Sequence, residues 1–297
     1  MHYAFQSFVL FLLACAVGSA PAAEPGKAPT IRVLAGDWGR AQPDEIEAVV
    51  RSAAGVLGGL VDYGAPLAIV VQPAAEHPEV RHDKTAQGEY LVALSARDRR
   101  WAQFAYQFGH EWCHVLANFD HRVAANGEPL TRHQWFEEAL CETAALFTLR
   151  TLAARWQSAP PYPHWKDYAP SFADYADGML AAEHRRHAQL RVLSSWYEEN
   201  SDVLARDPYA RRRNDFCAAA LLPLFESDPS QWNALRYLNL DGAAAEPTFS
   251  AYLARWQASV PERHRHFVAT IAAAFARKKS GDDSTPPLSS TAEAALH

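Results

Sequence analysis

The sequence predicts an α+β fold, in which a small amino-terminal mixed sheet with helices precedes a mainly helical carboxy-terminal lobe. Strand-like segments occur only before residue 97, where short β-branched runs surround one helical pattern. From there to residue 277 the spacing of apolar residues is helical. Apolar residues make up 49% of the 297 positions, so the chain can bury a substantial core.

The amino-terminal lobe is expected to span residues 30–96. Three apolar, β-branched runs predict strands: 30–35, 65–73 and 88–96. Residues 43–61 have helical spacing with acidic residues in the first turn, which favours a helix. The polar segment 74–87 predicts a loop between the second and third strands.

Two long helices are predicted at about 96–117 and 132–156, within a metal-binding segment that spans 97–156. Ser95 followed by Asp98 resembles a capping box at the start of the first helix. Prolines after the second helix prevent it from continuing. The helical lobe, 157–277, is expected to contain six further helices: 171–188, 192–205, 210–226, 230–238, 248–258 and 261–277. The small and polar tail, 278–297, is expected to be disordered.

The amino terminus carries an apolar run at residues 8–20 that is too short for an ordinary membrane span. Small residues follow it, and Ala20-Pro21-Ala22 fits a secretory cleavage pattern. We therefore predict a signal peptide over residues 1–23, export to the periplasm or the medium, and no stable membrane span after processing. Two alternatives remain open: an uncleaved amino-terminal helix, and a lipid anchor at Cys15, because "LLAC" resembles a bacterial lipobox.

The charge pattern argues against a nucleic-acid partner. The net charge is −6, and the basic runs are short and scattered among predicted helices. A nucleic-acid-binding surface needs a concentrated basic patch or stripe, so these runs are interpreted as solvated helix faces.

The segment "FGHEWCHVL", residues 108–116, contains the chemically most informative pattern. On a helix, His110 and His114 lie one turn apart on the same face, and Glu111 flanks them. Two imidazoles at this spacing can reach one zinc ion at about 2.0–2.1 Å, and the intervening glutamate can reach a water molecule bound to it. The polar face also fits a helix surface that is simply exposed to solvent or lines a cleft.

The next predicted helix contains "HQWFEEALCETAALF", residues 133–147, in which Glu138 and Glu142 are four residues apart and share a face. Together the two segments resemble the gluzincins, the zinc metallopeptidases that include thermolysin and the one-zinc aminopeptidases. Their pattern is H-E-x-x-H followed by a second helix with E-x-x-x-D/E. This resemblance implies a zincin-like catalytic core.

The resemblance also implies a role for each matched residue. Glu111 would be the general base, and Glu142 would orient a ligand histidine. Glu137 is an alternative third ligand, but it lies off the face of Glu142, which favours Glu138. One zinc ion per chain would be bound by three residues: His110, His114 and Glu138.

The function implied is that of a zinc-dependent metallopeptidase with a peptide or protein substrate. Zinc and Glu111 would deprotonate a water that attacks the amide carbonyl, zinc would polarise that carbonyl, and Glu111 would carry the proton to the leaving amine. These enzymes bind extended peptides along an edge strand. The predicted strand 88–96 occupies the corresponding place in the sequence, although it also fits an ordinary core strand.

Two departures from the family pattern limit the interpretation. Gluzincins stabilise the oxyanion with Tyr or His, but the corresponding position falls near Arg213 or Asn214, and the nearest tyrosine is Tyr209. Arg213 and Tyr209 are therefore the candidate transition-state donors. The G-x-M-E-N segment of the aminopeptidases is also missing, so aminopeptidase activity is not predicted.

The alternative function is an inactive zinc protein that serves as a binding or structural module in the cell envelope. The intact Glu111 argues against this alternative.

Two cysteines, Cys113 and Cys141, each lie three residues after a predicted ligand, on helices that must face each other. In an oxidising compartment they can form a disulfide between the two helices. The alternative is a pair of buried, unreactive thiols.

Overall fold

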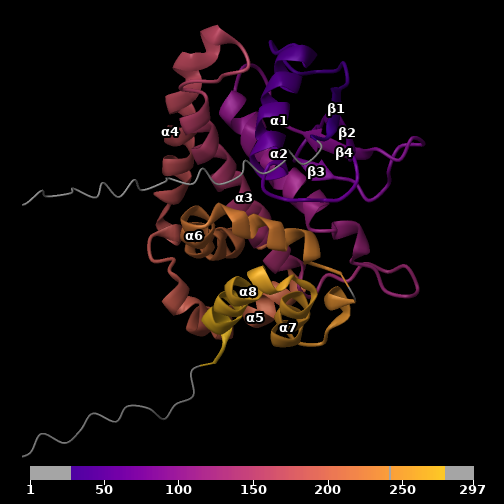
Figure 1. The fold of residues 1–297 in the computed structure, drawn as a ribbon, viewed down its shortest axis with the longest axis vertical. Helices are drawn as coiled ribbons and strands as arrows, with labels where there is room; N and C mark the ends of the chain where they lie inside the picture. The colour runs from indigo at the N-terminus through magenta and orange to yellow at the C-terminus, as the bar shows by residue number, and fades with distance from the viewer. Residues whose placement is uncertain (1–27, 241, 278–297) are drawn as a thin grey trace, which may run out of the picture.

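A computed structural model describes residues 28–240 and 242–277 of the chain. These residues form one small sheet and a larger set of helices, so the predicted α+β class is confirmed (Figure 1). The predicted signal peptide (1–23), the lipobox cysteine Cys15 and the tail (278–297) lie outside the described residues. No helix within the described ranges has the length and apolar character needed to cross a membrane.

The sheet has four strands in the order β1-β2-β4-β3. They are β1 (Thr30–Val33), β2 (Ala68–Pro73), β3 (Glu79–Val80) and β4 (Tyr90–Leu94). The strands β1, β2 and β4 run parallel, and β3 is antiparallel to β4. The two central strands are nearly continuous apolar runs because both of their faces are covered, as is usual for parallel strands.

The edge strand of the sheet next to the helix that carries His110 and His114 is not the strand predicted at 88–96. That segment forms β4, which lies between β2 and β3, so the core-strand interpretation is correct. The edge is β3, inside the segment 74–87 that was predicted to be a loop. With only two residues and half-exposed side chains, β3 has too short an apolar pattern to be recognised from the sequence.

Three helices position the site. The helix α1 (Pro43–Gly58) packs against α2 (Trp101–Leu116), and α2 packs against α3 (Gln134–Arg155). The start of α2 differs from the prediction, because the capping box at Ser95 does not form. Instead, the backbone N–H groups of Ser95 and Ala96 donate to Oε1 of Gln107 at 3.0 and 2.9 Å, and the helix begins at Trp101.

The described residues contain five more α-helices: α4 (Ala169–Leu180), α5 (Leu193–Arg206), α6 (Arg211–Ser227), α7 (Phe249–Ser259) and α8 (Glu262–Phe275). The predicted helix at 230–238 is a 3₁₀ helix, Pro229–Tyr237, whose start is capped by the Asp228 side chain. The predicted helix at 171–188 ends early, at Leu180. A turn and a short 3₁₀ segment follow, and they bring Arg185 against α6.

The helix α3 is buried on almost all sides. It runs through the middle of the molecule, between the elements around α2 and α4 and those around α6 and α8 (Figure 1). One hydrophobic cluster extends from Ile31 on β1 to Phe275 on α8 and includes apolar residues along the whole of α3. Charged side chains on such a helix need buried partners, since an unpaired buried charge is costly. The three glutamates of α3 therefore mark a site that other elements must complete.

The predicted disulfide between α2 and α3 is not formed. Cys113 and Cys141 are free, buried thiols that hydrogen-bond to each other. Burial raises the pKa of the Cys141 thiol well above its usual range, which disfavours the reactive thiolate. In this structure the two residues are packing groups between the helices.

Candidate functional site

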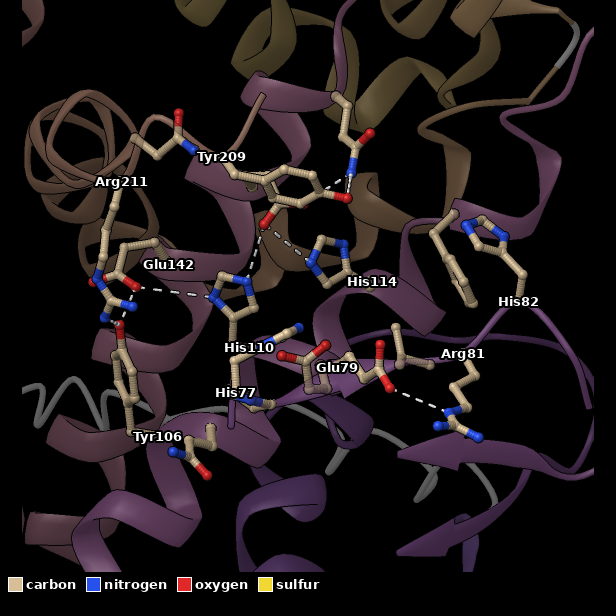
Figure 2. Close-up of a pocket in the computed structure, with 18 of the residues that line it drawn as sticks. His77, Glu79, Arg81, His82, Tyr106, His110, His114, Glu142, Tyr209 and Arg211 are labelled. Atoms are coloured by element: carbon tan, nitrogen blue, oxygen red, sulfur yellow. Dashed lines mark hydrogen bonds and ion pairs between the residues drawn. The ribbon is translucent and has the colours of Figure 1, made fainter. Parts of the chain in front are cut away.

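A cleft of about 750 Å³ opens along the polar face of α2. Its walls are formed by α2, α3, the β3 segment at 77–83 and the start of α6 (Figure 2). The polar face of α2 therefore lines a cleft instead of an open surface. Five of the lining side chains are the matched residues of the two sequence motifs: His110, Glu111, His114, Glu138 and Glu142.

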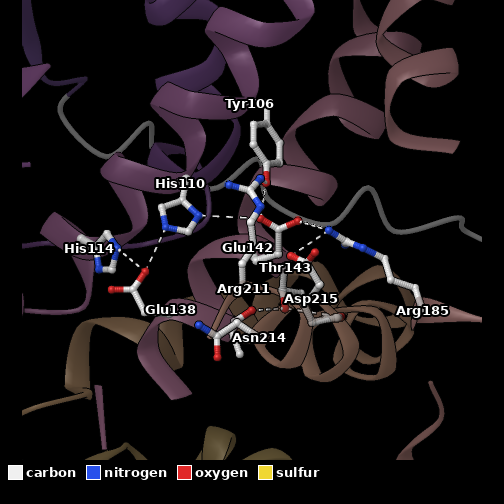
Figure 3. Close-up of polar contacts among 12 residues, drawn as sticks. Tyr106, His110, His114, Glu138, Glu142, Thr143, Arg185, Arg211, Asn214 and Asp215 are labelled. Atoms are coloured by element: carbon white, nitrogen blue, oxygen red, sulfur yellow. Dashed lines mark hydrogen bonds and ion pairs between the residues drawn. The ribbon is translucent and has the colours of Figure 1, made fainter. Parts of the chain in front are cut away.

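Three of these side chains converge on one point, because α2 and α3 pack with their motif faces toward each other. Oε2 of Glu138 lies 3.3 Å from Nε2 of His110 and 3.4 Å from Nε2 of His114 (Figure 3). One donor atom from each of the three residues lies within 4.8 Å of the others, so the group can hold a metal ion. Tetrahedral zinc with ligands at about 2.0–2.1 Å separates its donors by about 3.3 Å, which these distances match.

The electrostatics of the three donors favour positive charge. Burial lowers the pKa of His114, but the carboxylates of Glu138 and Glu137 outweigh burial and hold this pKa well above its usual range. The pKa of His110 is raised in the same way, with burial opposed by the hydrogen bond to Glu138. Burial raises the pKa of Glu138, yet the two imidazoles keep it well below its usual range. A site that stabilises positive charge at these atoms is suited to a cation.

Glu137 contacts the opposite nitrogen of His114. Its Oε1 lies 2.6 Å from Nδ1 of His114, so the carboxylate lies behind the ring and not beside the converging Nε2 atom. The carboxyl group is fully buried, and Nε of Arg122 lies 2.8 Å from its Oε2. Asn239 donates to the same oxygen at 2.7 Å. Glu137 is thus a buried partner that fixes the orientation of His114, a role that the sequence analysis did not assign to it.

Glu142 occupies the corresponding position behind His110. Its Oε2 lies 3.9 Å from Nδ1 of His110, and the same oxygen accepts a hydrogen bond from the Tyr106 hydroxyl. Nη2 of Arg185 donates to the other oxygen at 2.6 Å. The acid thus lies on the side of His110 expected for an orienting group. Its separation from the ring makes this an electrostatic contact, not a hydrogen bond.

The partners of Glu142 form a buried ionic cluster with Asp215. Nη2 of Arg185 also lies 2.9 Å from Asp215 (Figure 3). Nε2 of His184 lies 2.8 Å from the second oxygen of that acid. Burial and the Glu142 charge raise the pKa of Asp215. Arg185 and His184 belong to a run that the sequence analysis treated as a solvated basic face. Only its neighbours in space distinguish Arg185 from an exposed arginine.

Glu111 is buried in the cleft but is not one of the three converging donors. Only 4% of its surface is exposed, and the backbone N–H of Val80 in β3 donates a hydrogen bond to its carboxylate. Burial raises the pKa of this carboxyl group. The edge strand and the carboxylate are therefore close neighbours, on the side of α2 that faces the sheet.

The two candidate transition-state donors are placed differently. Tyr209 lines the cleft, and Gln134 donates to its hydroxyl at 2.8 Å and to Oε1 of Glu138 at 3.2 Å. Arg213 does not line the cleft, because its Nε donates to Asn200 on α5 at 2.7 Å. The expectation for Arg213 is therefore corrected. Residues two apart on a helix point about 200° apart, so Arg211, and not Arg213, faces the cleft.

Comparisons with models of protein families, with curated proteins and with solved structures find no match for this chain. A function therefore has to be argued from the geometry and chemistry of the cleft itself.

Proposed function

We propose that this protein is an exported zinc metallopeptidase with a gluzincin-like, zincin-type core. The observation that carries the proposal is the convergence of two imidazole nitrogens and one carboxylate oxygen at 3.3 to 3.4 Å, beside a buried glutamate in a large cleft. The zinc ligands would be His110, His114 and Glu138. Two nitrogens and one oxygen leave a fourth tetrahedral position open, which is typical of catalytic zinc sites. Export rests on the predicted signal peptide at 1–23.

Zinc held there would supply a Lewis acid that activates water and polarises a carbonyl. Glu111 then has the role of proton carrier: its carboxylate takes the proton of the attacking water and delivers it to the leaving amine. The Val80 N–H lies beside that carboxylate. Glu137 and Glu142 keep the two imidazoles oriented.

The edge strand β3 supports a peptide as the substrate. Within the sheet, the Arg81 N–H donates to the Leu91 carbonyl at 2.9 Å, whereas the neighbouring Val80 N–H is directed to Glu111. The outer side of β3 thus faces the cleft. An extended peptide that pairs with this edge would pass directly over Glu111, which is the arrangement that hydrolysis of a backbone amide requires.

The proposal is tested by measuring metal content and peptide hydrolysis in the same preparations. We expect the wild-type protein to hold about one zinc per chain and to cleave members of a mixed peptide library. Glu138→Gln removes a ligand charge and is expected to lose both zinc and cleavage. Glu76→Gln, an exposed acid outside the cleft, is the control and should match the wild type.

The second candidate function is that of an inactive zinc protein that acts as a binding or structural module in the cell envelope. The absence of an aromatic residue at Arg213 and Asn214 favours it. Zinc in the wild-type protein with no cleavage of any peptide would support this function. A wild-type protein without zinc would contradict both functions.

Tyr209 is the side chain that we propose as the oxyanion donor. Its hydroxyl reaches the cleft beside Glu138 through their shared partner Gln134. Tyr209→Phe is expected to lower kcat about 10²–10³-fold with little change in KM, because an oxyanion donor acts mainly in the transition state. Steady-state kinetics with a library-derived peptide measures both constants. Tyr237→Phe, outside the cleft, is the control, and a rise in KM alone for Tyr209→Phe would show a substrate-binding role instead.

A further inference from the structure

Arg211 is an arginine of the cleft that forms no direct ion pair with a carboxylate of the described residues. It is the first residue of α6, is exposed, and lines the cleft on the side of Glu142 (Figures 2 and 3). Its Nη2 donates to the Tyr106 hydroxyl at 3.1 Å. The carboxylates of Glu142 and Asp215 act on its charge only from beyond ion-pair distance.

Each of the other two arginines of the cleft forms an ion pair with a carboxylate. Nε of Arg81 lies 3.2 Å from Glu79, and Nε of Arg122 lies 2.8 Å from Glu137. A guanidinium has five N–H donors and stays charged at any ordinary pH. Arg211 therefore presents a cation with free donors to whatever enters the cleft.

Arg185, and not Arg211, makes the direct contacts with the two neighbouring acids. It binds Glu142 at 2.6 Å and Asp215 at 2.9 Å. Arg185 is only 4% exposed and does not line the cleft, so it holds the two acids from behind. Arg185 brings one positive charge to two carboxylates, so Arg211 also contributes to their compensation from a longer distance. The N–H donors of Arg211 that do not contact Tyr106 remain available in the cleft.

Tyr106 fixes the position of Arg211. Its hydroxyl donates to Glu142 and accepts from Nη2 of Arg211, so the guanidinium is tied to the acid behind His110. A planar guanidinium held in this way matches the two oxygens of a carboxylate. Three short contacts separate Arg211 from His110. The path along these contacts is an upper bound on the separation, and an extended peptide advances about 3.3–3.6 Å per residue, so the guanidinium and the His110 ring are at most about three residues of extended peptide apart.

We propose that Arg211 binds a carboxylate of the substrate, so that the cleft selects peptides with a negative charge within roughly three residues of the scissile bond. The carboxylate is either the carboxy terminus of the peptide or the side chain of an Asp or Glu residue. This inference rests on the proposed peptidase function, because it names the substrate class of the same cleft.

The test compares three forms of one peptide, namely a free carboxy terminus, a carboxy-terminal amide, and the amide with one Glu near the scissile bond. For the zinc-loaded wild-type protein we expect kcat/KM to be about 10–100-fold higher for at least one acidic form than for the amide. This ratio is what one hydrogen bond to a charged group typically contributes. Arg211→Met should reduce this ratio to near one, and Arg211→Lys should restore part of it. Arg212→Met is the matched control, since Arg212 is exposed and lies outside the cleft.

The outcomes separate this inference from the proposed function. Hydrolysis of all three forms at similar rates by the wild type would overturn the role of Arg211 and leave the peptidase in place. An equal loss of kcat for all three forms in Arg211→Met would also overturn it, because Arg211 would then act on the reaction and not on a carboxylate. If no form is hydrolysed, the peptidase function fails. The affinity of the wild type and of Arg211→Met for the three peptide forms, measured by calorimetry, then tests the carboxylate site. Tighter binding of an acidic form to the wild type than to Arg211→Met supports the carboxylate site, and equal binding overturns it.

Discussion

Replacing Glu111 with glutamine is expected to lower kcat for peptide hydrolysis about 10²–10⁴-fold, while the protein keeps its zinc. Glutamine has nearly the same shape but cannot accept the proton of the attacking water. The converging donors are His110, His114 and Glu138, so the substitution removes none of them. Metal analysis and steady-state kinetics on the same sample measure the two effects separately.

Glu79→Gln is the control for this experiment. Glu79 is a second glutamate of the cleft, but it pairs with Arg81 at 3.2 Å and belongs to β3. Its substitution removes one negative charge from the cleft without removing the proposed base, and kcat should stay close to the wild-type value. Loss of zinc from Glu111→Gln would show that Glu111 is a ligand. Full activity of Glu111→Gln would mean that another group accepts the proton.

Arg185→Met is expected to destabilise the folded protein by about 3–5 kcal/mol, because it removes the buried cation that contacts two buried carboxylates directly. Glu142 and Asp215 are 4% and 5% exposed, and Arg185 contacts both. The contacts from Tyr106 and His184 remain, and Arg211 acts on both acids from beyond ion-pair distance. None of these replaces a buried guanidinium that contacts both carboxylates. The free energy of unfolding from denaturant titration, at constant m-value, measures the loss.

Arg150 is a matched control for Arg185 within the same chain. It also bridges two acids, Asp177 at 3.2 Å and Glu226 at 2.9 Å, but its side chain is 41% exposed. Exposed pairs contribute about 0–1 kcal/mol, so Arg150→Met should change the free energy of unfolding by no more than that. A similar loss in the two variants would show that burial of the Arg185 cluster does not determine its contribution.

Local spacing was enough to predict which motif residues share a helix face. His110 and His114 share a face because four residues make about one helical turn, and the same spacing places Glu138 and Glu142 together on α3. The sequence also indicated that the faces of the two helices meet, through the resemblance of the combined pattern to one family. These features depend only on residues close together in the chain.

Other elements near the cleft had no such local signal. The edge strand β3 is two residues long, which is too short for a period of two to be recognised in a polar segment. Arg211 and Arg213 both lie in the run "RRR". Which of the two lines the cleft depends on which side of α6 faces it. Without the position of α5, whose Asn200 binds Arg213, the run cannot be resolved.

The sequence by itself determined the α+β class, the two motif helices and the donor types that suit a metal ion, because helical period and residue chemistry are local properties. Tertiary structure alone decided the compensation of the buried charges. Glu142 and Arg185 are 43 residues apart, and Glu137 and Asn239 are 102 apart, yet each pair is in contact. A buried charge takes its partner from whichever chain segment packs against it, and that segment is set by the burial of the whole core.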